Sequence, residues 1–459
     1  MKKNMLKKAA AIFLTAAMTA GLAACGAKGD DTSAVKQEAG EDSNASAESN
    51  EGNESSDSSG DEKVVLNVWH QWSNDTNELK KIYDEAVEAY LSEHPNVEIN
   101  TQTLDTEAYK TKIAAEFAGD AKGIDVFYYW GAGMAKKLVN ANKLLSFDEY
   151  ITEETKSKVV EGSTGAFEFD GKLYSLPSFS WYMTLFCNKE MFEQAGAEIP
   201  TTYEGLVDAV EKLKTLDGVT PFASGAKDGW NAAFIYQALA LREMGAEDIN
   251  KMLKGEEEFG AEGYKEAAEK VVELYEKGAF GDNPLEQSND DANSAFGTGK
   301  AAMRLMGSWY ANGIYTDENN TIKPENVVAV KIPMIEGEGD ETDYCGGFVE
   351  SFWVNNSTKY PQEAVDFAVY INEKMGVAAY ETGSGFSGWN SEADESQLNP
   401  LFIQIKDLLG EGKTGVLAWD TSLDAGPATT HNEMVQTLFA PGADVDAFME
   451  EHKMAINEE

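Results

Sequence analysis

The first part of the globular chain alternates short apolar runs with helical patterns, and this alternation restricts the fold more than any other feature of the sequence. Residues 63–70 (KVVLNVWH) are apolar and rich in β-branched side chains, which predicts a buried strand. Residues 79–91 place apolar side chains at helical spacing, and the pattern stops before Pro95. A strand over 96–104, a helix over 106–118 and a strand over 125–129 follow. The order βαβαβ predicts an α/β fold with a largely parallel sheet.

Three later helices are located by their terminal residues. The segment 201–204 (TTYE) has the form of a capping box and predicts a helix start. A helix with apolar residues from Tyr264 to Tyr275 ends before Gly278, which suits the left-handed position after a helix. Pro361 occupies a first-turn position of another helix. The α/β pattern therefore continues to the C-terminal half, without internal repeats.

The first 25 residues have the layout of an export signal. Four lysines among the first eight residues precede an apolar run over 9–22, which is too short to span a bilayer. The run ends in Leu22-Ala23-Ala24-Cys25, which resembles the lipobox of bacterial lipoproteins. We expect residues 1–25 to be a lipoprotein signal peptide with Cys25 as the lipidation site, since a diacylglycerol and an amide-linked chain supply the two anchors that stable attachment requires. An ordinary cleaved signal with an incidental cysteine is the alternative.

Residues 26–62 form an acidic segment of low complexity. The segment contains 11 acidic and 2 basic residues, no aromatic residue, and a single valine as its only large aliphatic residue. Such a composition cannot bury enough apolar surface to offset the entropy lost on ordering. We expect a disordered Ser/Glu/Asp-rich tether that separates the globular part from the membrane.

The whole chain is strongly acidic. It contains 80 Asp and Glu residues against 37 Lys and Arg, and its net charge is −43. This charge argues against a nucleic-acid partner, which requires a basic surface, and against adsorption onto anionic lipid. The excess of carboxylates lies mainly in the globular part and indicates a solvated surface.

Cysteine usage gives no disulfide framework. With Cys25 assigned to the leader, only Cys187 and Cys345 remain. Their strand-like surroundings favour two buried thiols, and a single disulfide between them is the alternative.

Motifs of catalysis and of metal binding do not occur with the spacing that they need. The four histidines form no H-E-x-x-H pair, and neither a P-loop lysine nor a G-x-S-x-G elbow is found. Residues 383–388 match G-x-G-x-x-G, but they follow a helical stretch rather than a strand, so we reject a dinucleotide site. The acidic segments 288–294 and 317–321 lack EF-hand spacing. We expect no metal and no cofactor, while a carboxylate pair for glycoside hydrolysis stays open among 80 carboxylates.

Most tryptophans lie beside Gly, Asn, Asp or Ser at predicted strand ends. Ligands of open α/β sheets bind beyond the carboxyl ends of the strands, where aromatic faces can stack on sugar rings. Trp69 and Trp353 lie inside strand-like runs and are interpreted as core. For the other seven, core packing and the binding of a neutral, hydroxyl-rich ligand explain the placement equally well. These seven are Trp72, Trp130, Trp181, Trp230, Trp309, Trp389 and Trp419.

Several sequence blocks occur in a consistent order along the globular part. They are GKLYSLP at 171–177, LFCNKEMF at 185–192, AG at 195–196, PTTYE at 200–204, FGTGKAAMRLMGSW at 296–309, IP at 332–333, GG at 346–347 and the helix after Pro361. Together they make the chain similar to the extracellular solute-binding proteins of bacterial ABC importers, in the sugar-binding branch that includes maltose-binding protein. The resemblance covers nearly all of residues 63–459. Cys187 stands where the family usually has Tyr, which we interpret as a packing change.

The resemblance implies two α/β lobes with a ligand cleft between them. The first lobe would contain 63–178 and 308–371, and the second 179–307 and 372–459. The chain would cross between lobes near 177–180, near 306–308 and near 371–375. Hinge closure around the ligand would present a surface to the permease subunits, with no bond made or broken. We expect a monomer on the outer face of the cytoplasmic membrane, typical of a Gram-positive cell.

The resemblance also implies a set of ligand-binding residues. The first-lobe blocks supply Gln71, Trp72, Asn74, Tyr129 and Trp130, with His70 adjacent to them. The second-lobe blocks supply Trp181, Trp230, Asn231, Trp309, Trp389, Trp419 and Asp420. Three or more of these tryptophans stacking on sugar rings would favour an oligosaccharide. Two alternatives stay open, namely a lipid-anchored enzyme acting on polysaccharide and a binding protein for a non-sugar ligand such as a polyamine.

Overall fold

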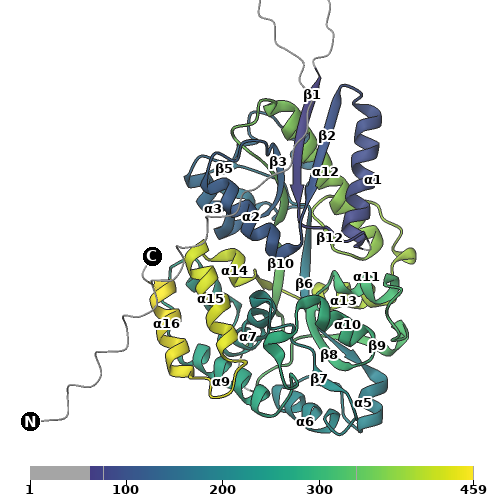
Figure 1. The fold of residues 1–459 in the computed structure, drawn as a ribbon, viewed down its shortest axis with the longest axis vertical. Coiled ribbons are helices and arrows are strands. Elements are labelled where there is room, and N and C mark those ends of the chain that lie inside the picture. Colours follow the sequence, from purple (N-terminus) through teal and green to yellow (C-terminus); the bar gives the residue numbers. More distant parts are fainter. Residues whose placement is uncertain (1–62, 76, 337–338, 458–459) are drawn as a thin grey trace, which may run out of the picture. The chain divides into compact units, whose positions relative to one another are not determined.

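The strands of the computed structural model form two larger sheets and one two-stranded sheet. The structure describes residues 63–75, 77–336 and 339–457, so the expected signal peptide over 1–25, with Cys25, and the expected tether over 26–62 lie outside the described residues. Helices pack on both larger sheets (Figure 1), and the predicted α/β class is confirmed.

The first sheet has the strand order β11-β3-β1-β2. Its strands are β1 (Val64–His70), β2 (Val97–Thr103), β3 (Val126–Trp130) and β11 (Glu350–Val354). Strand β1 runs parallel to β2 and β3, and β11 runs antiparallel to β3. The three strands predicted from the N-terminal alternation are therefore confirmed, and β11 joins them from a distant part of the chain.

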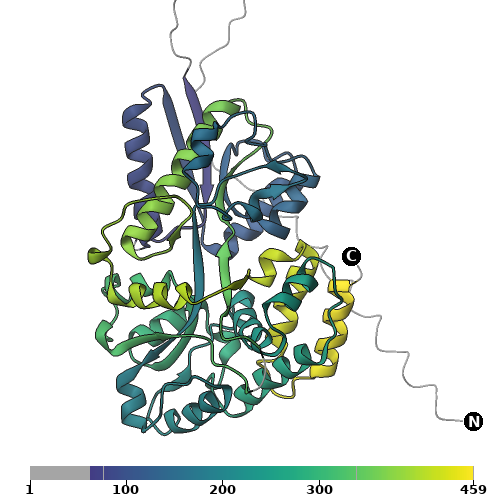
Figure 2. The same ribbon diagram turned by 180° about the vertical axis from the view of Figure 1, so that it is seen from behind.

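Four helices pack on the first sheet. They are α1 (Glu78–Glu93), α2 (Thr106–Ala118), α3 (Ala132–Asn140) and α12 (Pro361–Thr382). Helices α1 and α12 lie side by side (Figure 2). Tyr90 and Phe367 pack between them with ring centroids 5.1 Å apart. Helix α2 packs through Phe117 on Phe127 of β3. Asn77 and Asp105 cap α1 and α2 by accepting backbone hydrogen bonds, as short polar residues commonly do.

The second sheet has the strand order β13-β10-β6-β8-β7. Its strands are β6 (Phe179–Asn188), β7 (Thr220–Phe222), β8 (Ala301–Gly307), β10 (Asp343–Phe348) and β13 (Thr414–Val416), while β9 (Val327–Val330) and β12 (Phe386–Ser387) also pair with β6. Every residue of β6 is buried, so this strand is the centre of the sheet. The sheet mixes parallel and antiparallel pairs.

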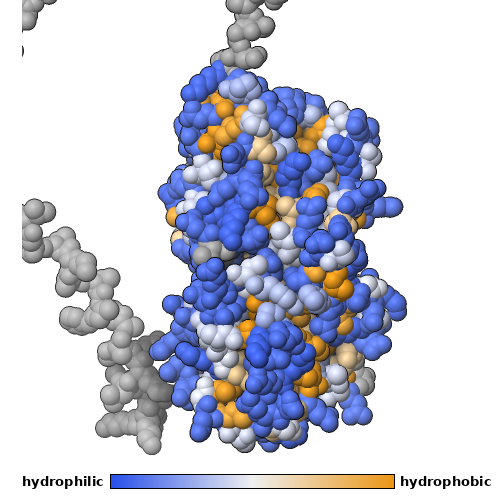
Figure 3. All heavy atoms as spheres, turned by 90° about the vertical axis from the view of Figure 1, so that its right-hand side faces the viewer, coloured by the Kyte–Doolittle hydropathy of each residue, from blue (hydrophilic) through white to orange (hydrophobic). Residues whose placement is uncertain are grey.

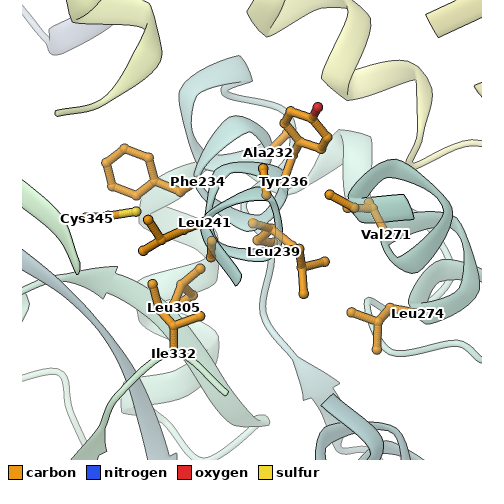
Figure 4. Close-up of a cluster of buried hydrophobic side chains, with 14 of the residues drawn as sticks. Ala232, Phe234, Tyr236, Leu239, Leu241, Val271, Leu274, Leu305, Ile332 and Cys345 are labelled. Carbon is orange, nitrogen blue, oxygen red and sulfur yellow. The ribbon is translucent and has the colours of Figure 1, made fainter. Parts of the chain in front are cut away.

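Helix α7 (Gly229–Met244) is the central helix of the second lobe. Its buried residues lie on all sides of the helix, as expected for an apolar helix enclosed by other elements. Figure 4 shows Phe234 and Leu241 pointing toward Cys345 and Leu305 on one side, with Val271 and Leu274 of a neighbouring helix on the other. The helices that pack on α7 include α9 (Glu262–Glu276), α14 (Trp419–Ser422), α15 (Ala425–Thr437) and α16 (Val445–Asn457). Helix α6 (Tyr203–Leu213) packs on α9, where the Tyr203 hydroxyl donates to Glu273.

Further helices and strands complete the two lobes. They are α4 (Glu153–Ser157), β4 (Glu168–Phe169), β5 (Lys172–Leu173), α5 (Lys189–Ala195), α8 (Ala246–Leu253), α10 (Asn289–Gly297), α11 (Tyr310–Thr316) and α13 (Pro400–Gly410). The helix predicted from the segment 201–204 is α6, and its capping residue is Thr202, whose hydroxyl accepts from the Gly205 amide. Gly278 adopts the left-handed φ of 77° expected after α9.

Within the described residues, the chain crosses between the sheets at three places. It enters the second sheet at the start of β6, returns to the first between Phe348 of β10 and Glu350 of β11, and leaves again between α12 and β12. The expected crossing near 177–180 agrees with the first of these. Ser178 donates its backbone amide to the Glu350 carbonyl, so the first two crossings lie side by side.

Two expected crossings, and with them the lobe boundaries, differ from the structure. Residues 306–308 stay in the second lobe because β8 pairs with β6 and the Ser308 amide donates to the Tyr182 carbonyl. The segment after residue 308 stays there too, since β9 and β10 both pair with β6. Residues 371–375 do not cross, because α12 continues as one helix to Thr382 and ends at Gly383 with a φ of 72°.

The two cysteines of the globular part are buried free thiols. Cys187 lies on β6 and Cys345 on β10, and neither forms a disulfide. Burial raises the pKa of both thiols, that of Cys345 to about 12. The interpretation as two packed thiols is confirmed.

The surface carries the excess of charged residues. On the face shown in Figure 3, hydrophilic side chains surround small separate groups of hydrophobic ones. None of the helices in the described part of the chain combines the length and the apolar composition needed to cross a bilayer.

Candidate ligand-binding site

Aromatic side chains line the carboxyl edge of the first sheet. Tyr128 and Trp130 project from the same face of β3, and their ring centroids are 5.7 Å apart. Trp72 follows β1, and its ring lies 4.6 Å from that of Tyr128. The backbone amide of Trp72 donates to Nδ1 of His70, which fixes the turn after the strand. This row of rings ends where the first sheet meets the crossing into β11.

A buried carboxyl group lies beside these rings. Glu350 is the first residue of β11 and pairs with Trp130 across the sheet. Its side chain is hydrogen-bonded by Tyr128 and Trp130, while its Oε2 atom is buried and has no partner among the described residues. Burial raises the pKa of Glu350 to about 7, against the opposing effects of Tyr128, Trp130 and the Lys110 ammonium.

A lysine connects this edge to the second lobe. Lys110 on α2 places Nζ 5.2 Å from the centroid of the Trp130 ring and 3.8 Å from Oδ2 of Asp420 on α14. Asp420 also accepts a weak hydrogen bond from the Asn432 amide at 3.5 Å. Beside this pair, α3 and α14 pack closely, because a Cβ added to Gly133 would lie 2.2 Å from the Ser422 carbonyl oxygen. The two lobes therefore touch at this point.

A second group of rings lies in the second lobe. Trp181 of β6 stacks on Phe234 of α7 with ring centroids 5.4 Å apart, and its edge meets Trp309 at 5.6 Å. Trp230 meets Phe234 edge to face at 5.2 Å. Trp230 and Trp309 are only partly buried, so each keeps aromatic surface that a ligand can contact. Phe234 belongs to this group although the sequence does not indicate it, because its apolar surroundings resemble those of any core residue.

A buried arginine organises the loops around α7. Arg304 of β8 is 1% exposed and donates to the Asn231 and Asn289 side-chain oxygens at 2.6 and 3.0 Å. It also donates to the backbone carbonyls of Ala223 and Ser224. Burial lowers the pKa of this guanidinium to about 10, so it stays charged at neutral pH. The arrangement fixes the Asn231 amide with its Nδ2 atom buried and without a partner among the described residues.

Comparison with known proteins gives the family. Residues 73–378, more than half of the chain, match the family described as bacterial extracellular solute-binding protein. The chain belongs to this family. Members are extracytoplasmic proteins, which agrees with the resemblance found in the sequence blocks.

Individual members with known names or structures extend the match. A solved structure from a study of xylan utilization by Caldanaerobius polysaccharolyticus has a TM-score of 0.81 and 33% identity, and the alignment covers 86% of this chain and 100% of that one. A chitin oligosaccharide binding protein has a TM-score of 0.77 at 21% identity, over 86% and 98% of the two chains. The galactooligosaccharide-binding protein of Bacillus subtilis is 26% identical over 82% of this chain and 80% of its own. The structural likenesses confirm the two-lobed solute-binding fold.

Some expected residues of this solute-binding protein meet at the lobe junction. Gln71 and Trp72 lie at the edge of the first sheet with Trp130, and the side chain of Gln71 hydrogen-bonds to Tyr128. Its Oε1 atom is buried and without a partner among the described residues. Asp420 of the second lobe is connected to this edge by its ion pair with Lys110. Trp181, Trp230, Asn231 and Trp309 belong to the second-lobe group.

Other expected residues of the solute-binding protein have different surroundings. Trp389 is 2% exposed and donates its Nε1–H to the Pro177 carbonyl at 2.7 Å, so it packs in the first lobe. Trp419 is 1% exposed and stacks on His431 with ring centroids 5.1 Å apart. We therefore remove Trp389 and Trp419 from the candidate site, because each ring is enclosed by core residues of a single lobe. Trp72, Trp130 and Trp181 are also buried, at 5%, 6% and 4% exposed, but they lie beside candidate polar groups or partly exposed rings.

Among the residues at the first-sheet edge, the prediction for Tyr129 needs correction. Tyr129 lies on the opposite face of β3 from Tyr128, with its ring 5.7 Å from that of Phe127. Asn74 is exposed beyond the end of β1. His70 is fully buried, and burial lowers its pKa to about 3, so it supports Trp72 as a neutral ring.

Lys110, Tyr128 and Glu350 are candidate residues that the sequence did not indicate. They come from α2, β3 and β11, which are far apart in the sequence. The local signal for Glu350 is weak, namely a glutamate that opens an apolar run three residues after a Gly-Gly pair. No group of three or more His, Cys, Asp or Glu residues in the described ranges is arranged to hold a metal ion.

Proposed function

We propose that this chain is the substrate-binding component of an ABC importer and that it captures an oligosaccharide between its lobes for delivery to the permease. The observation that carries the proposal is the pair of aromatic surfaces at the lobe junction. Trp230 and Trp309 offer partly exposed rings from the second lobe, and Trp72 and Trp130, which are 5% and 6% exposed in this arrangement, lie beside Gln71 and Glu350 in the first. Sugar rings present C–H faces to aromatic rings and hydroxyl groups to polar atoms, and both kinds of group are present here.

Three buried polar atoms of the protein are available to form hydrogen bonds with the hydroxyl groups of a ligand. Gln71 Oε1, Asn231 Nδ2 and Glu350 Oε2 are buried and have no partner among the described residues. Buried polar groups are normally hydrogen-bonded, and an orphaned group costs about 1–3 kcal/mol. Ligand hydroxyl groups would supply the missing partners of these atoms.

Xylan-derived oligosaccharides are the first ligands to test. The relative with 33% identity comes from work on xylan utilization, and its alignment covers all of that chain. Chitin oligosaccharides and galactooligosaccharides are the next, from the names of two further relatives. The spread of aromatic residues over both lobes favours a ligand longer than one sugar ring.

Thermal unfolding in the presence of candidate ligands tests the proposal. The purified protein would be melted with xylotriose, chitotriose, a galactooligosaccharide or spermidine, and each saccharide would then be recovered and analysed. A ligand that binds only the folded state raises the midpoint by mass action. We expect a rise with one saccharide class and its recovery intact. A rise with spermidine alone would establish the polyamine alternative, and consumption of the saccharide would establish the enzyme alternative.

We also propose that Cys25 is lipidated and anchors the protein to the outer face of the cytoplasmic membrane. The sequence Leu22-Ala23-Ala24-Cys25 after an apolar run supports this assignment. Cells expressing the wild type should incorporate labelled palmitate into the protein, and a Cys25→Ala variant should lose both the label and membrane retention. Equal labelling of the two proteins would contradict the assignment.

A further inference from the structure

Glu350 occupies the place where two crossings between the lobes meet. Phe348 still pairs with Ser180 in the second sheet, and Glu350, two residues later, pairs with Trp130 in the first. The backbone carbonyl of Glu350 accepts the Ser178 amide of the neighbouring crossing. The backbone of Glu350 is therefore held by hydrogen bonds on both sides at the hinge.

The carboxyl group of Glu350 has hydrogen-bond partners in the described residues for one of its two oxygens. Glu350 is 9% exposed, its side chain is hydrogen-bonded by Tyr128 and Trp130, and Oε2 has no partner among the described residues. Lys110 is the charged group that faces it, and the Lys110 ammonium lies 3.8 Å from Asp420 and 3.6 Å from Glu107. Lys110 is thus shared among three carboxylates and does not neutralise Glu350 alone.

Folding alone gives no reason for a carboxyl group at this position. Val349, directly before it, and Phe352, two residues after it, are core residues, and an apolar side chain would avoid the cost of burying a charge. Residues that oppose stability in this way cluster at functional sites. The unpartnered oxygen points to a group supplied from outside the protein.

We propose that Glu350 is a specificity-determining residue whose Oε2 atom accepts a hydrogen bond from a hydroxyl group of the bound saccharide at the hinge between the lobes. This inference rests on the proposed function and names the residue that recognises the ligand. A site built to bond a hydroxyl group rejects an analogue that lacks it far more strongly than an apolar pocket does. Glu350 would therefore distinguish a free hydroxyl from a methylated or deoxy position.

The test compares the wild type with Glu350→Gln and with the control Glu243→Gln. Glu243 is also a buried glutamate, but it pairs with Lys270 at the far end of α7 from Trp230. Each protein would be titrated calorimetrically with xylotriose, chitotriose and a galactooligosaccharide. We expect Glu350→Gln to weaken binding of the saccharide that the wild type binds by about 10-fold or more at pH 8, because the wild-type carboxyl group is ionised there and its charge-assisted hydrogen bond is lost. Glu243→Gln should bind it like the wild type.

Melting of the ligand-free proteins separates recognition from a structural role. Glutamine retains an oxygen for Tyr128 and Trp130 but carries no charge. Because burial raises the pKa of Glu350 to about 7, ionisation of the folded protein is unfavourable, and the variant should melt about 1–3 °C higher than the wild type at pH 8. The two proteins should differ little at pH 5. A purely structural glutamate would give a lower midpoint in the variant.

Each outcome decides the inference. If the wild type binds a saccharide and Glu350→Gln binds it equally well, Glu350 does not recognise the ligand, while the proposed function stands. Equal weakening in Glu243→Gln would also overturn the inference. If the wild type binds none of the three saccharides, the proposed function fails and the inference fails with it.

Discussion

At the scale of single residues, the tryptophans divide into two groups by what their rings contact. Trp389 and Trp419 are enclosed by protein, whereas Trp230 and Trp309 keep part of their surface accessible. The Trp309 ring lies against the backbone of Gly307, where a Cβ would approach it to 2.1 Å. Glycine at 307 therefore leaves the space that the Trp309 ring occupies beside Trp181 and Phe234.

Alanine at Trp230 or Trp309 should weaken saccharide binding without unfolding the protein. Removal of a stacking ring should raise the Kd by about 10-fold, equivalent to about 1.4 kcal/mol. Trp389→Ala is the matched control, because it should lower the free energy of unfolding by about 3–5 kcal/mol through a new cavity. Calorimetric titration and urea unfolding measure the two effects. Unchanged affinity in both Trp230→Ala and Trp309→Ala would exclude the second-lobe rings from the site.

Arg304 is a positioning residue at the same scale. Its guanidinium satisfies side-chain oxygens of Asn231, Asn289 and Asn293 and two backbone carbonyls. Arg304→Met should lower the free energy of unfolding by about 3–5 kcal/mol, since several buried acceptors lose their donor. Urea unfolding checks this value, and a loss under about 1 kcal/mol would show that the acceptors find other donors.

At the scale of secondary-structure elements, the contact between α3 and α14 connects the lobes. Gly133 allows it, because a Cβ there would lie 2.2 Å from the Ser422 carbonyl oxygen and 2.5 Å from that of Leu423. A larger residue must push α3 away from α14. The α3–α14 contact and the Lys110–Asp420 ion pair occur in the same arrangement of the two lobes.

Gly133→Ala should therefore disfavour the close arrangement of the lobes and reduce saccharide affinity. Ligand that binds between the lobes must supply the extra free energy of closure, so the apparent Kd should rise several-fold. Gly165→Ala is the matched control, because a Cβ at Gly165 meets nothing within 4 Å. Equal affinity of Gly133→Ala and the wild type in a calorimetric titration would show that the α3–α14 contact does not matter for binding.

Local sequence patterns predict the N-terminal strands and helices well. They do not predict where a strand pairs with a partner that is distant in the sequence. The first three strands and their helices follow from residues 63–129 alone, because their periodicity is local. The positions of β9 and β10 depend on pairing with β6, far away in the sequence, and the crossings were misplaced for this reason. Glu350 and Lys110 were missed because only the fold brings β11 and α2 together with Trp130.

At the scale of the whole molecule, buried ionisable groups determine how stability responds to pH. His70 and His452 are buried, and burial lowers their pKa values to about 3 and about 4, while that of His431 is lower than its ordinary value. His431 and His452 face each other with ring nitrogens 2.8 Å apart. In the folded protein these rings stay neutral at pH values where the unfolded chain binds protons.

Stability should therefore fall as the pH decreases below about 6.5. Each histidine that is neutral when folded and charged when unfolded contributes about 1.4 kcal/mol per pH unit, so three give about 4 kcal/mol per unit near pH 5. Glu350 acts in the opposite direction, since its raised pKa favours the folded protein below pH 7, but it is one group against three. Urea unfolding at pH 7, 6 and 5 measures the slope. A free energy of unfolding that is constant over this range would contradict burial of the neutral histidines.

The central claim concerns the whole molecule, namely that an oligosaccharide binds between the lobes and leaves unchanged. Calorimetric titration of the purified protein with xylotriose, chitotriose and a galactooligosaccharide, followed by chromatography of the saccharide, tests it most directly. We predict binding of one saccharide class with a stoichiometry of about one per chain, as expected for a single inter-lobe site, and full recovery of the intact saccharide. Absence of binding to all three saccharides, or their cleavage, would contradict the account.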